Sequence, residues 1–357
     1  MDPIYRDLLD LLEAGQPLAF AVLVETKGST PQKCGAKAIF LPDGRILGTL
    51  GGGCLEAETR QKALRAIETG EPFTFRAVLD DDFGWDDGLI CGGAVQTFVQ
   101  PNPRSREVWR ALMADPHSRQ RRVLVTVTTG EHAGKRALFA GDQLIVADDL
   151  PVETVADLAG QSAALLNEPE PEPILRSAYF EPVLPKPILV IFGGGHVGAA
   201  VGKLAAWSGF EVIAVDDRPS FASKERFPDA ASVIVDDPAK VAKELPVDAD
   251  TYLCIVTRGH RHDAVVLKEI IHSKAAYIGM IGSKRKVRTV MEGFINDGVC
   301  TAEDFRRVHS PMGVAIHSLT VEEIAVSVVA ELIAQRRGAQ NANSLSVTNA
   351  IADKLAR

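Results

Sequence analysis

One short glycine-rich segment constrains the fold of this chain more than any other feature. Residues Gly193 to Gly198 read Gly-Gly-Gly-His-Val-Gly and directly follow the apolar run Ile188-Phe192. We expect the run to be a buried strand and the glycine segment to open a helix. In such a unit Gly193 permits a tight turn, Gly195 permits close approach of a phosphate, and Gly198 lets the helix pack on the strand. The free N–H groups and the dipole at the helix start favour an anion.

The rest of the C-terminal half continues this alternation of strand and helix. Short apolar runs at 188–192, 211–215, 232–235, 251–256 and 276–281 are separated by helical stretches. Near-continuous apolar strands of this kind are typical of a parallel sheet that is covered on both faces. Asp216 ends the second run, roughly 20 residues beyond Gly193, where dinucleotide-binding folds place a carboxylate for the ribose. The pattern predicts an α/β chain whose C-terminal domain, residues 188–338, is a Rossmann-like doubly wound parallel sheet.

The glycine loop is compatible with more than one ligand. A nucleotide such as NAD(P) could bind there, or the fold could be a scaffold whose phosphate site serves another ligand, because fold alone does not fix function. Asp216 favours NAD over NADP, whereas the nearby Arg218 weakens that preference. His196 could reach a ligand, or it could be a polar residue tolerated at the helix start.

The N-terminal half has a less regular pattern. Strand-like runs, turns and helical stretches alternate over residues 1–166 and predict an α+β domain. Glu and Pro alternate from Asn167 to Pro173, and further prolines follow as far as Pro187. We therefore expect an extended, exposed linker over residues 167–187. Residues 339–357 are polar and weakly helical, and we expect them to form a tail.

Composition limits the classes of partner. The chain has 357 residues and a formal net charge of −8, which argues against duplex nucleic acid, whose affinity depends on Lys and Arg. No stretch approaches the roughly 18 apolar residues of a membrane span, and the first residues lack the order of a signal peptide. We expect a cytoplasmic protein without a membrane partner.

The five cysteines are scattered and form no Cys-x-x-Cys pair. This spacing suits reduced thiols. For the assembly, base rates favour a homodimer.

Several further motifs accompany the glycine loop. They are Gly28-Ser29-Thr30-Pro31, the run from Gly48 to Glu56, Cys91-Gly92-Gly93, Thr257-Arg258-Gly259-His260 with Asp263, the run from Ile278 to Lys286, and Ser310-Pro311-Met312-Gly313. Together they make the chain resemble the XdhC/CoxI family, the accessory factors of xanthine dehydrogenase and related molybdenum hydroxylases. The resemblance covers both halves and leaves out the middle, from about Pro101 to Ala178, and the tail.

This resemblance implies a role in cofactor maturation. Family members bind molybdenum cofactor, shield it, allow a partner cysteine desulfurase or sulfurtransferase to sulfurate it, and deliver it to an apo xanthine dehydrogenase-type hydroxylase. The cofactor is an anionic phosphorylated pterin with an oxygen-sensitive metal, so its carrier needs a phosphate cradle and can use a soft ligand or a sulfur relay. We therefore expect a chaperone rather than a catalyst. The alternative is an NAD(P)-dependent oxidoreductase, although no residue pairing points clearly to proton transfer beside a nicotinamide.

The N-terminal motifs supply candidates for the cradle and the relay. Gly51, Gly52 and Gly53 lie between a predicted strand and a predicted helix, where backbone donors could hold a phosphate. Cys54 would lie in the first helical turn, where the helix dipole favours the thiolate. A thiolate there could contact molybdenum or accept sulfur. A small buried apolar role is the alternative for this cysteine.

The remaining candidates lie in both halves. Cys91 is a second candidate thiol for molybdenum or sulfur, because two glycines leave it approachable. Ser29 and Thr30 could orient a ligand or form a simple turn. Four C-terminal residues follow predicted strands at the edge where doubly wound folds bind ligands. They are Arg258 and His260, as anion or pterin contacts in preference to metal ligands, and Ser283 and Lys284, as phosphate contacts or a solvated helix start.

Overall fold

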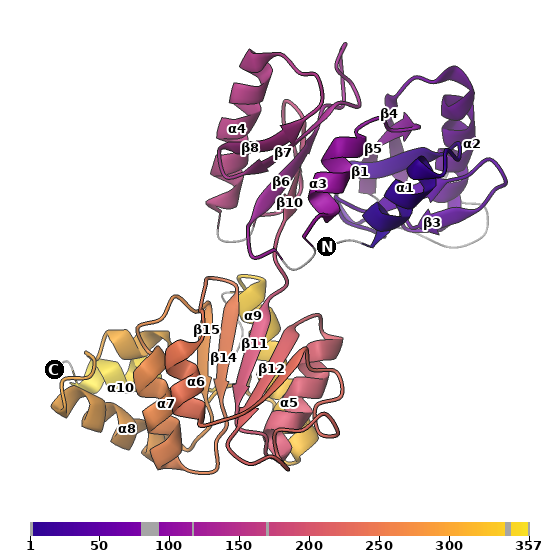
Figure 1. Ribbon diagram of the computed structural model, residues 1–357. Helices are drawn as coiled ribbons and strands as arrows, with labels where there is room; N and C mark the ends of the chain where they lie inside the picture. Colours follow the sequence, from indigo (N-terminus) through magenta and orange to yellow (C-terminus); the bar gives the residue numbers. More distant parts are fainter. Residues whose placement is uncertain (1–2, 80–92, 116–117, 169–170, 340–343, 356–357) are drawn as a thin grey trace. The chain divides into compact units, whose positions relative to one another are not determined.

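A computed structural model describes residues 3–79, 93–115, 118–168, 171–339 and 344–355 of the chain. The chain divides into two compact units, Met1–Pro185 (unit 1) and Lys186–Arg357 (unit 2). Figure 1 labels their helices and most of their strands. Among the described residues, no helix is both long enough and apolar enough to cross a lipid bilayer.

Unit 2 is built on a six-stranded parallel sheet, which confirms the predicted Rossmann-like fold. Its strand order is β13-β12-β11-β14-β15-β16. The strands are β11 (Ile188–Phe192), β12 (Glu211–Asp216), β13 (Ser232–Val235), β14 (Thr251–Ile255), β15 (Tyr277–Met280) and β16 (Val308–His309). The direction of strand addition reverses between β11 and β14, which is where α/β folds bind ligands, outside the carboxyl ends of the strands.

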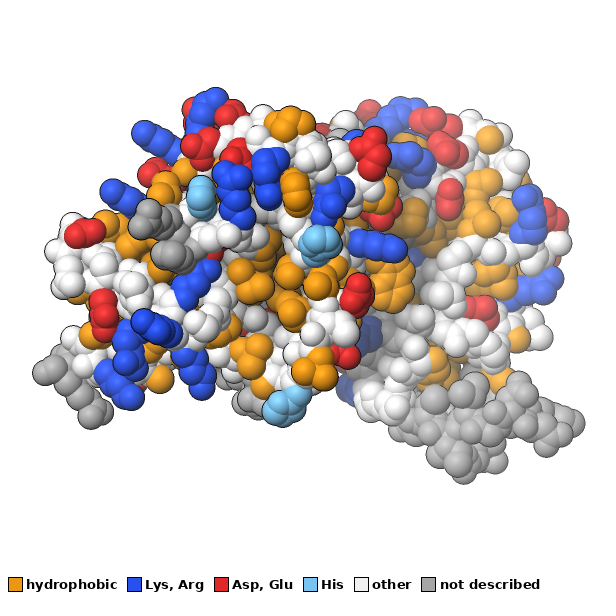
Figure 2. Space-filling model, turned by 90° about the horizontal axis from the view of Figure 1, so that it is seen from below, with side chains coloured by type: hydrophobic (Ala, Val, Ile, Leu, Met, Phe, Trp, Pro, Cys, Tyr) orange, Lys and Arg blue, Asp and Glu red, His pale blue; other side chains and the backbone are white. Residues whose placement is uncertain are grey.

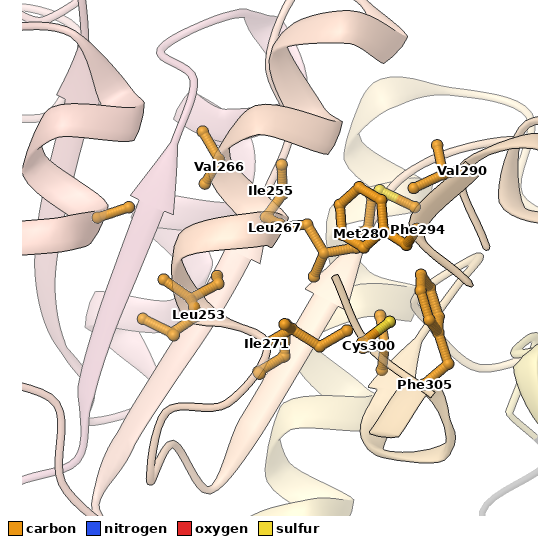
Figure 3. Close-up of a cluster of buried hydrophobic side chains, with 14 of the residues drawn as sticks. Leu253, Ile255, Val266, Leu267, Ile271, Met280, Val290, Phe294, Cys300 and Phe305 are labelled. Carbon is orange, nitrogen blue, oxygen red and sulfur yellow. The ribbon is translucent and has the colours of Figure 1, made fainter. Parts of the chain in front are cut away.

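Helices cover both faces of this sheet. Alternate residues of each strand point to opposite sides, and apolar side chains on both sides must be buried. In β11, Leu189 and Ile191 pack against α5 (His196–Trp207) and α9 (Val321–Arg336). Val190 and Phe192 belong to the core on the other face. The helices on that face are α6 (Pro238–Glu244), α7 (His260–Ile270), α8 (Lys284–Asn296) and α10 (Thr348–Leu355). Figure 3 shows this second core, in which Leu253, Ile255 and Met280 of the sheet meet apolar side chains of α7 and α8.

In its described residues, unit 1 contains two five-stranded sheets and four helices, in agreement with the predicted α+β class. The sheet orders are β3-β2-β1-β5-β4 and β8-β7-β6-β10-β9, and their neighbouring strands are antiparallel. The first sheet consists of β1 (Ala19–Lys27), β2 (Lys37–Phe40), β3 (Ile46–Gly48), β4 (Phe73–Leu79) and β5 (Gly93–Pro101). The second consists of β6 (Arg122–Thr126), β7 (Arg136–Ala140), β8 (Gln143–Ala147), β9 (Ile174–Leu175) and β10 (Tyr179–Val183).

A shared core joins the two sheets of unit 1. The helices are α1 (Ile4–Glu13), α2 (Gly53–Thr69), α3 (Arg106–Met113) and α4 (Val152–Leu166). Trp109 of α3 is fully buried in a cluster that includes Phe20 of the first sheet and Leu124 of the second. The Trp109 ring stacks on that of Tyr5 of α1, with the centroids 5.4 Å apart. The two sheets therefore form one folded body.

The structure corrects two expectations about the connecting segments. Strands β9 and β10 lie within residues 167–187, and β10 pairs with β6 along its whole length, so residues 174–183 belong to unit 1 and not to an exposed linker. Tyr179 and Phe180 are buried there, and this burial outweighs the proline content nearby. In the predicted tail, 339–357, helix α10 places Ile351 and Ala352 in the core of unit 2.

Candidate functional site

The glycines after β11 divide into two kinds. Gly193 has a φ of 122°, and a Cβ there would lie 2.4 Å from the carbonyl oxygen of Val256. A Cβ at Gly198 would lie 2.0 Å from the carbonyl oxygen of Gly193, so helix α5 can pack this closely only on a glycine. A Cβ at Gly195 would meet no atom within 4 Å. The space over Gly195 is therefore open to a ligand, whereas Gly193 and Gly198 serve packing.

This difference predicts the effects of two matched substitutions. Gly198→Ala should lower the free energy of unfolding of unit 2 by about 1–3 kcal/mol, because the new methyl group forces backbone atoms apart. Gly195→Ala should change it by less than about 0.5 kcal/mol, because nothing occupies the space. Thermal unfolding of the two variants beside the wild type measures both effects. Equal melting temperatures for the two variants would contradict the assignment.

The N-terminus of α5 is a second feature of this loop. The helix begins at His196 after the N-cap Gly195, and no side chain caps it. Its first backbone bond runs from the N–H of Ala199 to the carbonyl oxygen of Gly195, so the earlier N–H groups have no partner within the helix. His196 is exposed beside them. The geometry suits an anion.

Asp216 ends β12 as predicted, but its carboxylate is fully engaged within the protein. One oxygen accepts hydrogen bonds from the backbone N–H and Nε of Arg218, at 3.0 and 2.8 Å. The other accepts from the N–H of Gly194 and from Nη2 of Arg218, at 2.8 and 2.9 Å. Burial raises the pKa of Asp216, but these hydrogen bonds outweigh it and bring the pKa to about 2. A carboxylate has about four acceptor positions, and all four are occupied.

A cavity of about 430 Å³ lies beside this carboxylate at the carboxyl edge of the sheet. Its polar lining includes Asp217, Arg218 and Arg258, and an ion pair of 2.9 Å joins Asp217 to Arg258. In Figure 1 the strands of unit 2 run downward, so Figure 2, seen from below, looks toward this edge and shows Lys, Arg and His side chains among hydrophobic ones. Arg258, which was predicted to contact a ligand, therefore lines this cavity.

The loops after β14 and β15 are tied together by a buried acid. Asp263 is fully buried and accepts hydrogen bonds from the N–H and Oγ1 of Thr257, at 3.1 and 2.6 Å. It also forms an ion pair with Lys286, whose Nζ donates to the carbonyl oxygen of Ile281 at 2.8 Å. Asp263 therefore links the loop after β14 to the loop after β15.

The other predicted C-terminal contacts flank these loops. Ser283 is the N-cap of α8, and its Oγ accepts from the N–H of Lys286 at 3.4 Å. Lys284 is exposed in the first turn of this helix. His260 opens α7, and its side chain lies outside what the structure describes.

In unit 1 the structure brings three of the predicted motifs together. A Cβ at Gly51 would lie 2.9 Å from Cβ of Pro31, and a Cβ at Gly93 would lie 2.2 Å from the carbonyl oxygen of Ser29. The 28–31 turn therefore touches both the glycine loop and the start of β5. Cys91 itself lies outside the described residues. Thr30 uses its hydroxyl within the turn, donating to the carbonyl oxygen of Gln32 at 2.8 Å.

Cys54 lies in the first turn of α2, as predicted, and its thiol is exposed. The alternative, a small buried apolar residue, is therefore wrong for this cysteine. The other three described cysteines, Cys34, Cys254 and Cys300, are less exposed. Burial raises the pKa of Cys34 and of Cys300 to about 11 each, and that of Cys254 further still. Among the cysteines that the structure describes, Cys54 is the exposed one.

Glu56 changes the expectation for the Gly51–Gly53 loop. Its Oε1 accepts hydrogen bonds from Oγ1 of Thr49 at 2.6 Å and from the N–H groups of Leu50 and Gly52 at 3.0 and 3.1 Å. Burial raises the pKa of Glu56, but the hydrogen bonds together lower it below its ordinary value. A side-chain carboxylate thus already occupies donors that were predicted to hold a phosphate. In the described parts of the chain, no three His, Cys, Asp or Glu side chains form a group that could hold a metal ion.

Comparisons with known proteins agree with both units. Residues 189–332 match the XdhC Rossmann domain and residues 11–77 match the XdhC and CoxI family. The chain is 27% identical to a probable xanthine dehydrogenase subunit of Bacillus subtilis, over 93% of this chain and 98% of that protein. It is 24% identical to the molybdenum cofactor insertion chaperone PaoD of Escherichia coli, over 93% of this chain and 88% of that protein.

A solved structure shows the same architecture along nearly the whole chain. It is the crystal structure of a Bacillus halodurans protein described as a xanthine dehydrogenase. The TM-score is 0.71 at 26% sequence identity, and the match covers 95% of this chain and 98% of that one. The sequence motifs, the two family matches and this shared architecture agree, and the chain belongs to the XdhC and CoxI family.

Proposed function

We propose that this protein binds molybdenum cofactor as cargo and supports its insertion into an apo xanthine dehydrogenase-type hydroxylase. The observation that carries the proposal is the gathering of the family motifs of unit 1 beside an exposed thiol, Cys54, at the start of α2. The similarity to PaoD supports the same role.

The residues fit a phosphorylated pterin in two respects. The uncapped start of α5 and the open space over Gly195 suit the phosphate group. The Gly51–Gly53 loop suits it less well, because Glu56 holds the donors of Leu50 and Gly52. Cys54 supplies a soft sulfur ligand of the kind that molybdenum accepts. Unit 2 thus holds a candidate phosphate site, and unit 1 holds a candidate thiol.

We further propose that Cys54, with Cys91, supports sulfuration. The Cys54 thiolate would attack the outer sulfur of a persulfide carried by a partner cysteine desulfurase or sulfurtransferase. The sulfur–sulfur bond of the partner breaks, its cysteine leaves as a thiolate, and Cys54 becomes the persulfide. A solvent-exposed position is needed for this exchange, and Cys54 has one. A homodimer and a cytoplasmic location remain predictions.

The cysteine proposal predicts the behaviour of two variants. Cys54→Ala should reduce the molybdenum and pterin content of protein purified anaerobically from a cofactor-producing host by severalfold, with the melting temperature unchanged. Cys34→Ala is the matched control and should retain the wild-type content, because its half-buried thiol donates to the carbonyl oxygen of Val24. Metal analysis and pterin fluorescence measure both contents. Wild-type content in Cys54→Ala would remove this thiol from the proposal.

The alternative function, an NAD(P)-dependent oxidoreductase, predicts a different bound molecule in the purified protein. Stoichiometric NAD(P) without pterin in the same purified protein would favour it. The occupied acceptors of Asp216 count against a ribose contact at that residue, which the prediction for NAD used.

A further inference from the structure

Unit 1 has a cavity of its own, of about 520 Å³, between the end of α1 and the start of α3. Residues within 12–17 and 102–106 line it. The described residues of this lining include two arginines, Arg104 and Arg106, and no carboxylate. The chain as a whole carries a net charge of −8. The cavity is therefore a basic site in an acidic protein, and its volume lies in the range of pockets for small organic ligands.

The side chain of Arg106 is held in place from α1. Arg106 is the first residue of α3, and its Nη2 donates to the carbonyl oxygen of Leu12, in the last turn of α1, at 2.9 Å. A guanidinium has five N–H donors, so four remain for other acceptors. Its planar set of donors matches the oxygens of a phosphate or a carboxylate. Arg106 is therefore oriented by the protein and still able to bind an anion.

The loop that carries Arg104 is anchored on both sides. Asn102 exchanges two hydrogen bonds with Leu18: its N–H donates to the carbonyl oxygen and its Oδ1 accepts from the N–H, both at 2.9 Å. Ser105 is buried, and its hydroxyl donates to the carboxylate of Asp148. Arg104 is exposed between these anchors, and in the described part of the chain its side chain has neither a hydrogen bond nor an ion pair. A free guanidinium thus lies on an ordered loop, which lowers the entropic cost of binding a ligand.

The end of α1 does not oppose an anion in this cavity. The last carbonyl oxygens of a helix carry partial negative charge, which repels anions when they are unpaired. In α1 the carbonyl oxygen of Leu11 accepts from the N–H of Gln16 at 3.0 Å. That of Leu12 accepts from the N–H of Gly15 at 3.2 Å as well as from Arg106. The protein therefore pairs these oxygens itself, and the arginines determine the charge of the cavity.

We propose that this cavity binds a small organic molecule through a phosphate monoester group. Such a group carries about two negative charges near neutral pH, which matches the two guanidinium groups, and its three terminal oxygens can accept several of their N–H donors. A carboxylate offers one charge and two oxygens, so it satisfies the site less fully. Pro17 and Pro103 also line the cavity and supply apolar surface for the organic part of the ligand.

This site goes beyond the proposed function and does not rest on it. Residues 102–106 lie outside both segments that match the family models, 11–77 and 189–332. Among the described residues, neither Cys54 nor any residue of α5 lines the cavity. The site can therefore be tested without molybdenum or pterin.

The test uses phenyl phosphate as the probe, because this molecule combines a phosphate monoester with a small apolar group. Calorimetric titration of the full chain measures the affinity, and hydrogen exchange with and without the probe locates the bound molecule. We expect saturable binding and slower exchange in peptides that cover residues 12–18 and 102–110. Inorganic phosphate, which lacks the apolar group, and benzoate, which has a carboxylate, should each bind more weakly.

Variants of Arg104 test the role of the guanidinium. Arg104→Gln should weaken the binding of phenyl phosphate roughly tenfold or more, because hydrogen bonds between charged groups are lost, and should leave the melting temperature unchanged. Arg104→Lys should lose less affinity, since it keeps the charge. Arg110→Gln is the matched control, because Arg110 is exposed on α3, binds Glu13 at 2.8 Å and does not line the cavity. Its affinity should equal that of the wild type.

The outcomes separate this site from the proposed function. No protection of these peptides at millimolar phenyl phosphate, or the same affinity in Arg104→Gln and the wild type, would overturn the phosphate site. Tighter binding of benzoate than of phenyl phosphate would assign the cavity to carboxylates and overturn it too. Protection confined to peptides from the start of α5 would place the probe in unit 2, which contradicts this proposal and leaves the proposed function intact.

Discussion

Replacing Glu331 with alanine is expected to lower the free energy of unfolding of unit 2 by about 3–5 kcal/mol, because a buried charge network loses its centre. Glu331 is 3% exposed. One oxygen accepts from the hydroxyl of Tyr277 at 2.5 Å and from the N–H of Gly313 at 2.7 Å. The other accepts from the hydroxyl of Ser344 and lies 3.2 Å from Nδ1 of His309. Alanine would leave several of these polar groups buried without a partner.

Hydrogen exchange of peptides from α9 and β15 measures the effect within unit 2. Glu322→Ala is the control, because Glu322 is exposed in the first turn of the same helix. We expect faster exchange in Glu331→Ala and wild-type exchange in Glu322→Ala. The same protection in both variants would show that the network contributes little.

The pKa of Glu331 adds a pH dependence to this prediction. Burial raises that pKa, but hydrogen bonds from His309, Ser344, Tyr277 and Gly313 outweigh it and hold the pKa below its ordinary value. Because the folded-state pKa is lowered, Glu331 stabilises unit 2 above the unfolded pKa, roughly 4.3. That contribution is lost as the pH falls through the folded-state pKa. Glu331→Gln should lack this part of the acid dependence.

The second large effect is expected from Lys37, in the core of unit 1. Lys37 and Glu181 are 7% and 8% exposed, and Nζ lies 2.9 Å from the carboxylate, which also accepts from the hydroxyl of Tyr5 at 2.6 Å. Lys37→Ala should lower the free energy of unfolding by about 3–5 kcal/mol, because it leaves a buried carboxylate without its cation. Urea unfolding followed by the fluorescence of the buried Trp109 measures this change.

A double variant separates the charge from the packing. Lys37→Met with Glu181→Gln should recover at least half of the loss, since buried ion pairs can be replaced by neutral groups at little cost. Lys62→Ala, which removes a more exposed ion pair within α2, should change the stability by less than about 0.5 kcal/mol. A loss below about 1 kcal/mol in Lys37→Ala would mean that water or a rearrangement solvates Glu181.

The sequence was informative about the fold wherever burial produces a continuous apolar run. Strands β11, β12, β14 and β15 follow this rule, whereas β13 carries an apolar run without a fully buried residue; the parallel sheet was predicted from all five. Strand β16 has two residues, too few to form a pattern, and it pairs with β15 only through Ile278 and Gly279. Strand β10 lies among prolines, and its burial depends on a partner strand, β6, more than 50 residues earlier in the chain.

The site was predictable at the level of motifs but not of individual hydrogen bonds. Gly193 and Gly198 were identified because a strand, a glycine pattern and a helix occur in order. The sequence cannot show that Arg218 and the N–H of Gly194 occupy the acceptor positions of Asp216 while Asp217 stays exposed. This arrangement depends on the side-chain conformation of Arg218. Glu56 ends the motif that runs from Gly48 to Glu56. Its carboxylate accepts from the N–H of Gly52 only because the chain turns back between β3 and α2.

The packing of the last helix limits where the protein can be shortened. The family match for the Rossmann domain ends at residue 332, yet Thr348 donates to the carbonyl oxygen of Val308, and Ile351 lies in the core beyond that limit. A fragment cut at the end of the match would uncover apolar surface beside β16. Truncated variants, fusion junctions and crystallisation trials should therefore keep the C-terminal segment at least to Leu355.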